Sequence, residues 1–261
     1  MRRIAVPGAF AALGLAILLG LGIWQLERLQ WKEALIARVN SRLSATPAPA
    51  PGPDAWTNLD VADLEYTPVT VAGHFDNAHE AYVVDSLTEP RGKYSGFGYL
   101  VMTPFVTDAG WTVYVNRGFV PTDRKAPESR KGSQIEGETS VTGLVRAAHD
   151  RSWFMPSDRP SGNEWFSRDP HLYAAAAGLT GKQVAPYLID AKFNSDLPGG
   201  LPQGGETIID FPNNHLQYAL TWFGLAGGLA VVFIIFARGR LKVPAPSAGS
   251  DRPHEARRKG R

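Results

Sequence analysis

The stretch FPNNHLQYALTWFGLAGGLAVVFIIFARGR, residues 211–240, decides the fold of this chain. It opens with a polar turn and then runs from Leu216 to Ala237 without a charged side chain. As an α-helix these 22 residues would be about 33 Å long, which matches a bilayer hydrocarbon core of roughly 30 Å. We therefore expect a membrane span here. His215 stands at its entrance, where water, lipid headgroups and acyl chains meet.

A second uncharged segment lies near the start of the chain, at residues 4–26. Pro7 falls in its first turn, where proline is tolerated. The segment is longer than the apolar region of a secretory signal peptide, and no small-x-small cleavage pattern follows it. We therefore expect an uncleaved span. Two spans place both chain termini on the same side of the membrane.

These two spans divide the chain into seven expected segments. They are a cytoplasmic N-terminus at 1–3, a first transmembrane helix at 4–26, a helical extension at 27–46, a proline-rich linker at 47–64, an exported mainly-β domain at 65–213, a second transmembrane helix at 214–237 and a basic cytoplasmic tail at 238–261. The linker is expected to be stiff and extended because its prolines alternate with small residues.

The distribution of charge predicts the sidedness of the chain. Residues 27–214 carry 17 Lys and Arg against 23 Asp and Glu, whereas residues 238–261 carry eight basic side chains against two acidic ones. Basic residues are retained on the cytoplasmic side. Four basic residues after the first span oppose this assignment, but no Lys or Arg lies in residues 193–237 and three follow within the next six. We expect cytoplasmic termini, a periplasmic main domain and a bacterial inner membrane.

Two further properties of the composition exclude some functions. The chain has no cysteine, so an exported domain must be stable through its core rather than through disulfides. A nucleic-acid-binding role for the basic tail is less favoured than a positive-inside flank of the span, so we expect no nucleic-acid partner. The lipid bilayer is the expected surrounding of both helices.

Between the spans, apolar and polar residues alternate in short runs that are typical of β-strands. We expect strands at 66–75, 81–85, 96–105, 111–120, 139–145 and 183–190. A short helix is expected after Asp169, with Pro170 in its first position and Gly178 at its end. Short polar turns between strands indicate an antiparallel meander that closes into a barrel or sandwich. The fold class is thus a membrane protein with two transmembrane α-helices flanking one exported, mainly-β domain.

Small residues suggest that the two spans pack on each other. Gly8, Ala12, Ala16 and Gly20 recur every four residues in the first span, and Gly224 and Gly228 have the same spacing in the second. Such stripes let two helices approach closely.

Nothing in the sequence favours catalysis. The residues form none of the hydrolase, metalloprotease or phosphate-loop motifs, so we expect no catalytic residue and no enzyme. His215 is the candidate for another role, because Tyr218 and Trp222 follow it at i+3 and i+7 and share its helix face. Ala219 and Ala226 are expected to leave room beside that face.

Two interpretations of this histidine face remain open on the residues alone. A flat apolar macrocycle would lie against the aromatic side chains, with the neutral imidazole as an axial ligand to its iron. Alternatively, His215 caps the helix and the aromatic residues anchor it at the membrane interface.

Arg117, at the end of an expected strand, also has two interpretations. It either forms an ion pair at a β-turn or binds carboxylates, such as haem propionates or an acidic partner surface. Its spacing favours neither.

Four stretches of the sequence together resemble one known family. They are Gly22, Trp24, Gln25, Arg28, Trp31 and Lys32; Tyr66, Pro68, Val69, Gly73 and Phe75; Gly96, Gly98, Tyr99, Thr103, Pro104 and Phe105 with residues 115–121; and Asn213, Asn214, His215, Tyr218, Thr221, Trp222 and Phe223. With two spans around one exported domain, the chain resembles the surfeit-locus cytochrome c oxidase assembly factors of mitochondria and related bacteria. Phe119 stands where the family often has Trp, a change that should keep the aromatic packing.

The resemblance implies a chaperone that helps build the haem a centre of the oxidase, a step in respiratory chain biogenesis. Haem a would come from the membrane-bound haem a synthase, wait against His215, Tyr218 and Trp222, and move into oxidase subunit I. Arg117 and Arg28 are then candidate partners for the haem propionates. The competing function is a scaffold without cofactor, which would hold oxidase subunits or haem a synthase by protein contacts alone.

Overall fold

The computed structural model describes residues 2–179, 183–194, 197–207 and 211–241. The chain forms two compact units, a helical unit from residues 1–34 and 212–261 and a domain from Leu35–Phe211. Most of the expected tail at 238–261 lies outside the described residues.

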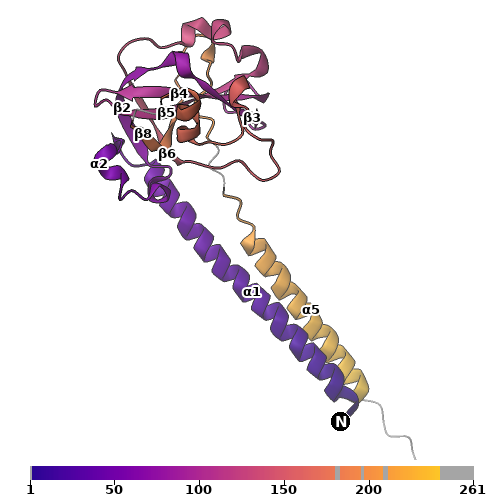
Figure 1. Cartoon of the computed structure of the whole chain (residues 1–261). Helices are drawn as coiled ribbons and strands as arrows, with labels where there is room; N and C mark the ends of the chain where they lie inside the picture. The colour runs from indigo at the N-terminus through magenta and orange to yellow at the C-terminus, as the bar shows by residue number, and fades with distance from the viewer. Residues whose placement is uncertain (1, 180–182, 195–196, 208–210, 242–261) are drawn as a thin grey trace, which may run out of the picture. The chain divides into compact units, whose positions relative to one another are not determined.

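Two long helices form the helical unit (Figure 1). Helix α1 covers Arg2–Leu43 and helix α5 covers His215–Leu241. Both are long and apolar enough to cross a membrane, within Ile4–Leu43 and His215–Leu241. The chain is therefore a membrane protein, as expected from its two spans. Pro7 lies inside α1 without ending it.

The two helices run side by side and antiparallel (Figure 1). A Cβ atom added to Gly8 would lie 3.4 Å from the Phe233 ring, and one added to Gly22 would lie 2.5 Å from the Phe223 ring. Between them, Gly14 approaches Leu229. The predicted packing of the helices is thus confirmed.

Only one of the predicted glycines makes these contacts. Gly8 belongs to the predicted stripe of the first span, whereas Gly20, Gly224 and Gly228 have no neighbouring atom within 4 Å of an added Cβ, so the four-residue period was wrong for these three. Gly8 and Gly22 are two heptads apart. A pair of long helices keeps its seam with a seven-residue period, because 3.5 residues per turn holds one face toward the partner.

Within the described residues, eight strands build the domain. They are β1 (Ala48–Pro49), β2 (Pro68–Phe75), β3 (Ala81–Leu87), β4 (Gly96–Thr107), β5 (Thr112–Pro121), β6 (Thr139–Ala147), β7 (Glu164–Trp165) and β8 (Val184–Ala191). Helix α4 (Pro170–Ala176) precedes β8, and the Asp169 carboxylate caps it by accepting from the His171 N–H. The six longer strands and this helix lie where the sequence predicts them. The two-residue strands β1 and β7 are too short to leave a pattern.

The sheet has the order β1-β2-β6-β8-β5-β4-β3-β7, and an additional pairing of β2 with β4 closes five of its strands into a barrel. Gly73 makes this closure possible, because it pairs with Thr139 of β6 and with Thr107 of β4. A Cβ at Gly73 would lie 2.1 Å from the carbonyl oxygen of Val106. Its φ of 151° also lies in a region that side chains disfavour. The predicted barrel-like fold is confirmed.

The predicted meander, in contrast, was wrong. Strand β8 lies between β6 and β5 and runs parallel to β5. Parallel neighbours need a long crossover, and here the connection from β5 to β8 contains β6 and helix α4. Alternation within a strand predicts that it has two faces but not which strand it pairs with.

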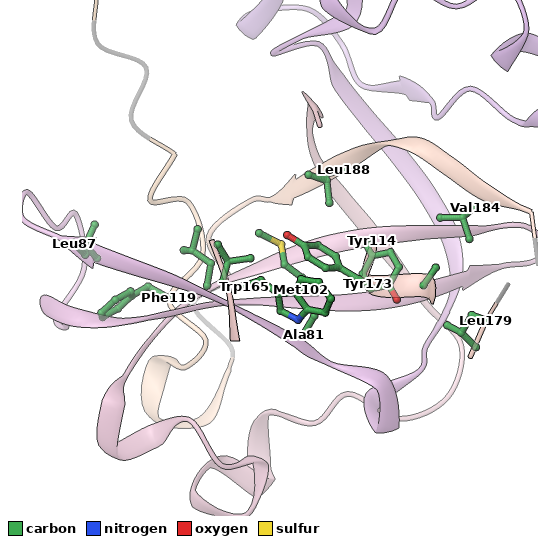
Figure 2. Packing of buried hydrophobic residues seen from close by; sticks show 13 residues of the cluster. Ala81, Leu87, Met102, Tyr114, Phe119, Trp165, Tyr173, Leu179, Val184 and Leu188 are labelled. Carbon is green, nitrogen blue, oxygen red and sulfur yellow. The ribbon is translucent and has the colours of Figure 1, made fainter. Parts of the chain in front are cut away.

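Central strands carry a core on each face. All five barrel strands contribute to an interior cluster that includes Val71, Phe105, Val113, Val145 and Ile189. Alternate residues point to a second cluster, which α4 helps to cover. In Figure 2 the rings of Tyr114 and Tyr173 lie together beside Met102 and Trp165. The Tyr114 and Tyr173 ring centroids are 5.3 Å apart in an edge-to-face contact.

The segment expected to be a linker is part of the domain. Strand β1 pairs with β2, and two helical turns follow, α2 (Pro53–Trp56) and α3 (Val61–Leu64). Trp56 packs edge-to-face on Trp111, with 5.7 Å between ring centroids. The expectation of an extended linker overlooked that Pro53 is suited to the first position of a helix.

The segment between β8 and α5 is hydrogen-bonded to β5 at Gln203. Gln203 and Phe119 exchange both backbone hydrogen bonds, at 2.9 and 2.8 Å. Gly118 allows this crossing, since a Cβ there would lie 2.2 Å from the Gln203 backbone. Phe119, where the family often has Trp, is fully buried in the second cluster.

Candidate functional site

His215 forms a hydrogen bond with Gln25 across the helical unit. Its Nδ1 lies 2.7 Å from the side-chain carbonyl oxygen of Gln25, and both residues are half-buried. A carbonyl oxygen only accepts, so Nδ1 carries the hydrogen and donates. The lone pair of the neutral ring is then on Nε2. This tautomer is the one in which a histidine, held at its other nitrogen, binds a metal.

The pairing of the helices positions these two side chains. Gly22 lies one turn before Gln25 on α1, and its partner Phe223 lies two turns after His215 on α5. The first helical hydrogen bond of α5 runs from Tyr218 N–H to the carbonyl of Asn214, at 3.2 Å. His215 is therefore the first residue of a regular helix, and the contact of Gly22 with the Phe223 ring brings the two helices together near the His215–Gln25 pair.

The other residues predicted on the histidine face differ in exposure. Tyr218 is 56% exposed and Trp222 is half-buried. Ala219 and Ala226 are only 1% and 2% exposed. These alanines lie in the seam of the helix pair and do not leave room beside the aromatic residues, so that detail of the prediction was wrong. Small residues in such a seam let helix backbones approach.

Arg28 follows Gln25 by one turn on α1. Its guanidinium carbon lies 5.7 Å from the ring centroids of both Trp24 and Trp31. Stacking uses the flat face of the guanidinium and leaves its N–H edge available. Among the described residues, no carboxylate is paired with Arg28, so its charge is available to an anion.

Arg117 belongs to the domain and is buried in a polar network. It donates to Asn77 Oδ1 at 3.1 Å and to the Ser133 carbonyl, and it lies 3.5 Å from Glu80 Oε1. Arg130 also pairs with Glu80, at 2.5 Å. Burial lowers the pKa of Arg117 to about 10, although the Glu80 charge opposes this shift. At neutral pH Arg117 is therefore charged and in an ion pair; binding of a propionate by it stays a prediction.

Comparison with known proteins places the whole arrangement in one family. The model of the SURF1 family matches residues 12–227. The chain is 42% identical to Surfeit locus protein 1 of Homo sapiens over 232 residues, which are 84% of this chain and 74% of the relative. Identity to Surfeit locus protein 1 of Mus musculus is 42% over 82% of this chain and 70% of the relative. The protein of Takifugu rubripes is 38% identical over 86% and 94%.

This chain belongs to the SURF1 family.

The SURF1 match includes every residue predicted for the site. His215, Tyr218, Trp222 and Arg28 lie together in the helical unit, and Arg117 lies in the domain. The matched residues extend over both units of this SURF1 chain.

Sequence reasoning assigned no role to Gln25. An uncharged polar residue at the end of a span indicates only where the span ends. The pairing of the helices shows that the partner of Gln25 is His215, 190 residues away in the chain. The sequence did contain a usable signal. The two spans cross the membrane in opposite directions, so a polar residue at the end of the first is expected to lie near a polar residue at the start of the second. Glu80 and Arg130 left no such signal.

Proposed function

We propose that this SURF1-family protein is an assembly factor for cytochrome c oxidase that binds haem a through His215 and helps its insertion into subunit I. The observation that carries the proposal is the hydrogen bond from His215 Nδ1 to Gln25. It holds the imidazole with its Nε2 lone pair unshared, which is the form a haem iron accepts. The family relationship supports the oxidase as the recipient.

The residues of the helical unit fit haem a as cargo. When bound, haem a supplies an iron that takes an axial nitrogen ligand. Tyr218 and Trp222 offer aromatic surface to an apolar macrocycle. Arg28 offers a guanidinium edge that pairs with no carboxylate of the described residues and can receive a propionate. In this proposal His215 binds the iron, Gln25 orients the imidazole ring of His215, and Arg28 neutralises the negative charge of a propionate. None of these roles moves a proton or breaks a bond, so we infer a carrier rather than an enzyme.

A carrier must also release its cargo. One protein ligand at a half-buried helix end provides affinity without enclosing the cargo in a core. We infer that haem a synthase supplies haem a and that subunit I removes it. We also infer an inner-membrane location with cytoplasmic termini and a periplasmic domain, since the basic tail favours that orientation.

The test is the absorbance spectrum of the purified full chain in detergent, from cells that make haem a. We expect a Soret band and a haem a α-band that are lost in His215→Ala. His171→Ala removes an exposed histidine of α4 and serves as the matched control; it should leave both bands unchanged. Undiminished bands in His215→Ala would overturn the proposed ligand. A colourless wild-type protein that still captures subunit I would replace the carrier by the scaffold.

A further inference from the structure

A cavity of about 440 Å³ lies in the domain, between the C-terminal end of α1, strand β6 and the segment that follows β8. All of its lining residues fall within residues 35–211, so the cavity belongs to one compact unit. Leu43, Pro47, Pro68 and Leu144 give it apolar walls. Pockets of roughly 300 to 1,000 Å³ with mainly apolar walls are typical of small-molecule sites. The size and the walls therefore suit a ligand with an apolar part.

Two positively charged side chains line the same cavity. Arg91 comes from the connection between β3 and β4, and Lys192 directly follows β8. Gly205 connects the two positions, because its carbonyl accepts from the Arg91 guanidinium at 3.4 Å and its N–H donates to the Ala191 carbonyl at 3.2 Å. Among the described residues, no carboxylate forms an ion pair with either cation. Both charges are therefore available to a ligand.

Asp190 also lines the cavity, but its negative charge is already compensated. Its carboxylate accepts from Asn116 at 2.9 Å, from Arg146 at 3.1 Å and from Thr207 at 2.7 Å. The side chain is only 6% exposed. A carboxylate that is paired with an arginine and bound by two further donors is satisfied within the protein. The cavity thus keeps the excess positive charge of Arg91 and Lys192.

The backbone that carries each cation is fixed by hydrogen bonds. The N–H groups of Arg91 and Gly92 donate to the two oxygens of the Glu206 carboxylate, at 2.8 and 2.9 Å. The Lys192 N–H donates to the Thr142 carbonyl at 3.0 Å. Both cationic residues are exposed at the mouth of the cavity. Binding of a ligand there orders side chains but no backbone, which keeps its entropic cost low.

We propose that this cavity binds an amphiphile with one anionic head group, a carboxylate or a phosphate, and a single apolar chain. Arg91 and Lys192 pair with the head group, since guanidinium and ammonium groups form charge-assisted hydrogen bonds with either anion. The chain lies against Leu43, Pro47 and Leu144, where its burial is favourable. Free fatty acids and lysophospholipids both have this chemistry. The site is separate from His215 and does not depend on haem binding.

The test is photo-cross-linking of the full chain in phosphatidylcholine nanodiscs. Two anionic probes carry the same diazirine-bearing chain, one as a fatty acid and the other as an acyl-glycerol phosphate. The matching fatty alcohol is the uncharged control probe. We expect an anionic probe to label residues 43–47 or 142–144, as read by mass spectrometry of the peptides, and the alcohol to label them far less. Labelling by the acid indicates a free fatty acid as the natural ligand, and labelling by the phosphate indicates a lysophospholipid.

A double variant, Arg91→Gln with Lys192→Gln, should lower this labelling about tenfold or more, because it removes both charged donors. Lys131→Gln with Arg151→Gln removes the same charge from exposed positions outside the cavity and should leave the labelling unchanged. Ala45→Trp keeps both cations but fills the apolar part, and it should also lower the labelling. Equal labelling of the two double variants, equal labelling by the alcohol, or no labelling at these residues would overturn the proposal.

Discussion

Two polar side chains of this protein, Glu80 and His215, differ in how much of their hydrogen-bonding capacity is used. In the domain, Glu80 accepts from two arginines, from Tyr82 and from Gln134, and its side chain is 2% exposed. In the helical unit, His215 has one hydrogen bond, to Gln25, and a second nitrogen without a partner among the described residues. A buried carboxylate that accepts several hydrogen bonds stabilises a fold, whereas a ring nitrogen with an unused lone pair can bind a ligand. The contrast between Glu80 and His215 can be tested on both sides.

Removal of the Glu80 charge should have the largest effect on stability. Glu80→Gln leaves Arg117 and Arg130 charged and buried without their carboxylate. Breaking a buried pair from one side costs about 3 to 5 kcal/mol, so the midpoint of thermal unfolding in detergent should fall steeply. Glu138→Gln is the control, because that carboxylate is 72% exposed beside His74 and should contribute less than about 1 kcal/mol. Equal midpoints for the two variants would contradict a structural role of the network.

The complementary change is Gln25→Leu, which should weaken haem a binding and leave the domain stable. Loss of an outer partner of a metal-binding histidine commonly lowers affinity about 10- to 100-fold. Titration of the purified protein with haem a, followed by the Soret band, measures this. Gln25→Glu keeps an acceptor for Nδ1 and should restore binding, and Gln217→Leu alters an exposed glutamine of α5 as a control. If Gln25→Glu binds as weakly as Gln25→Leu, the hydrogen bond is not what matters.

The packing of α1 against α5 is expected to affect both stability and haem a binding, and Gly22→Val tests this expectation. The new side chain would meet the Phe223 ring, which can move only in part, so we expect a loss of about 1 to 2 kcal/mol together with weaker haem a binding. Gly20→Val adds the same side chain where an added Cβ has no neighbour within 4 Å, and it should change neither property. Thermal unfolding and haem titration of both variants decide this. Similar losses of stability and of haem a binding in both variants would contradict this expectation, because any added side chain in α1 would then have the same effect.

The smallest expected effect concerns Asp158, in the connection between β6 and β7. Burial raises the pKa of this carboxyl, but hydrogen bonds from Ser167 and Phe166 outweigh burial and lower the pKa below its usual range. A carboxylate with a lowered pKa in the folded state adds stability at neutral pH, and this stability is lost as the pH falls through that lowered pKa. Asp158→Asn should cost about 1 kcal/mol at pH 7 and less at pH 2. Urea unfolding at both pH values, with exposed Asp150→Asn as control, measures the difference.

How much of the structure the sequence could predict depended on how far apart the interacting residues lie in the chain. The spans, the six longer strands and the α4 cap are local patterns, and they were predicted closely. Strand order was not, because β8 pairs with strands from earlier in the chain. The Glu80 network was missed for the same reason, since Arg130 is 50 residues from its partner. At the candidate site, His215 was singled out from the residues of its own helix, and its role stays a prediction. Gln25 became a candidate only once the antiparallel pairing of the helices was known.

The position of β8 also has a consequence for synthesis. It is the last strand to leave the ribosome, yet it occupies a central place between β6 and β5. The domain cannot close until this strand is available, so most of the soluble part waits unfinished while translation proceeds. Helix α5 follows soon after β8 in the chain. Completion of the barrel and delivery of the second hydrophobic segment to the translocon therefore fall within the same short period.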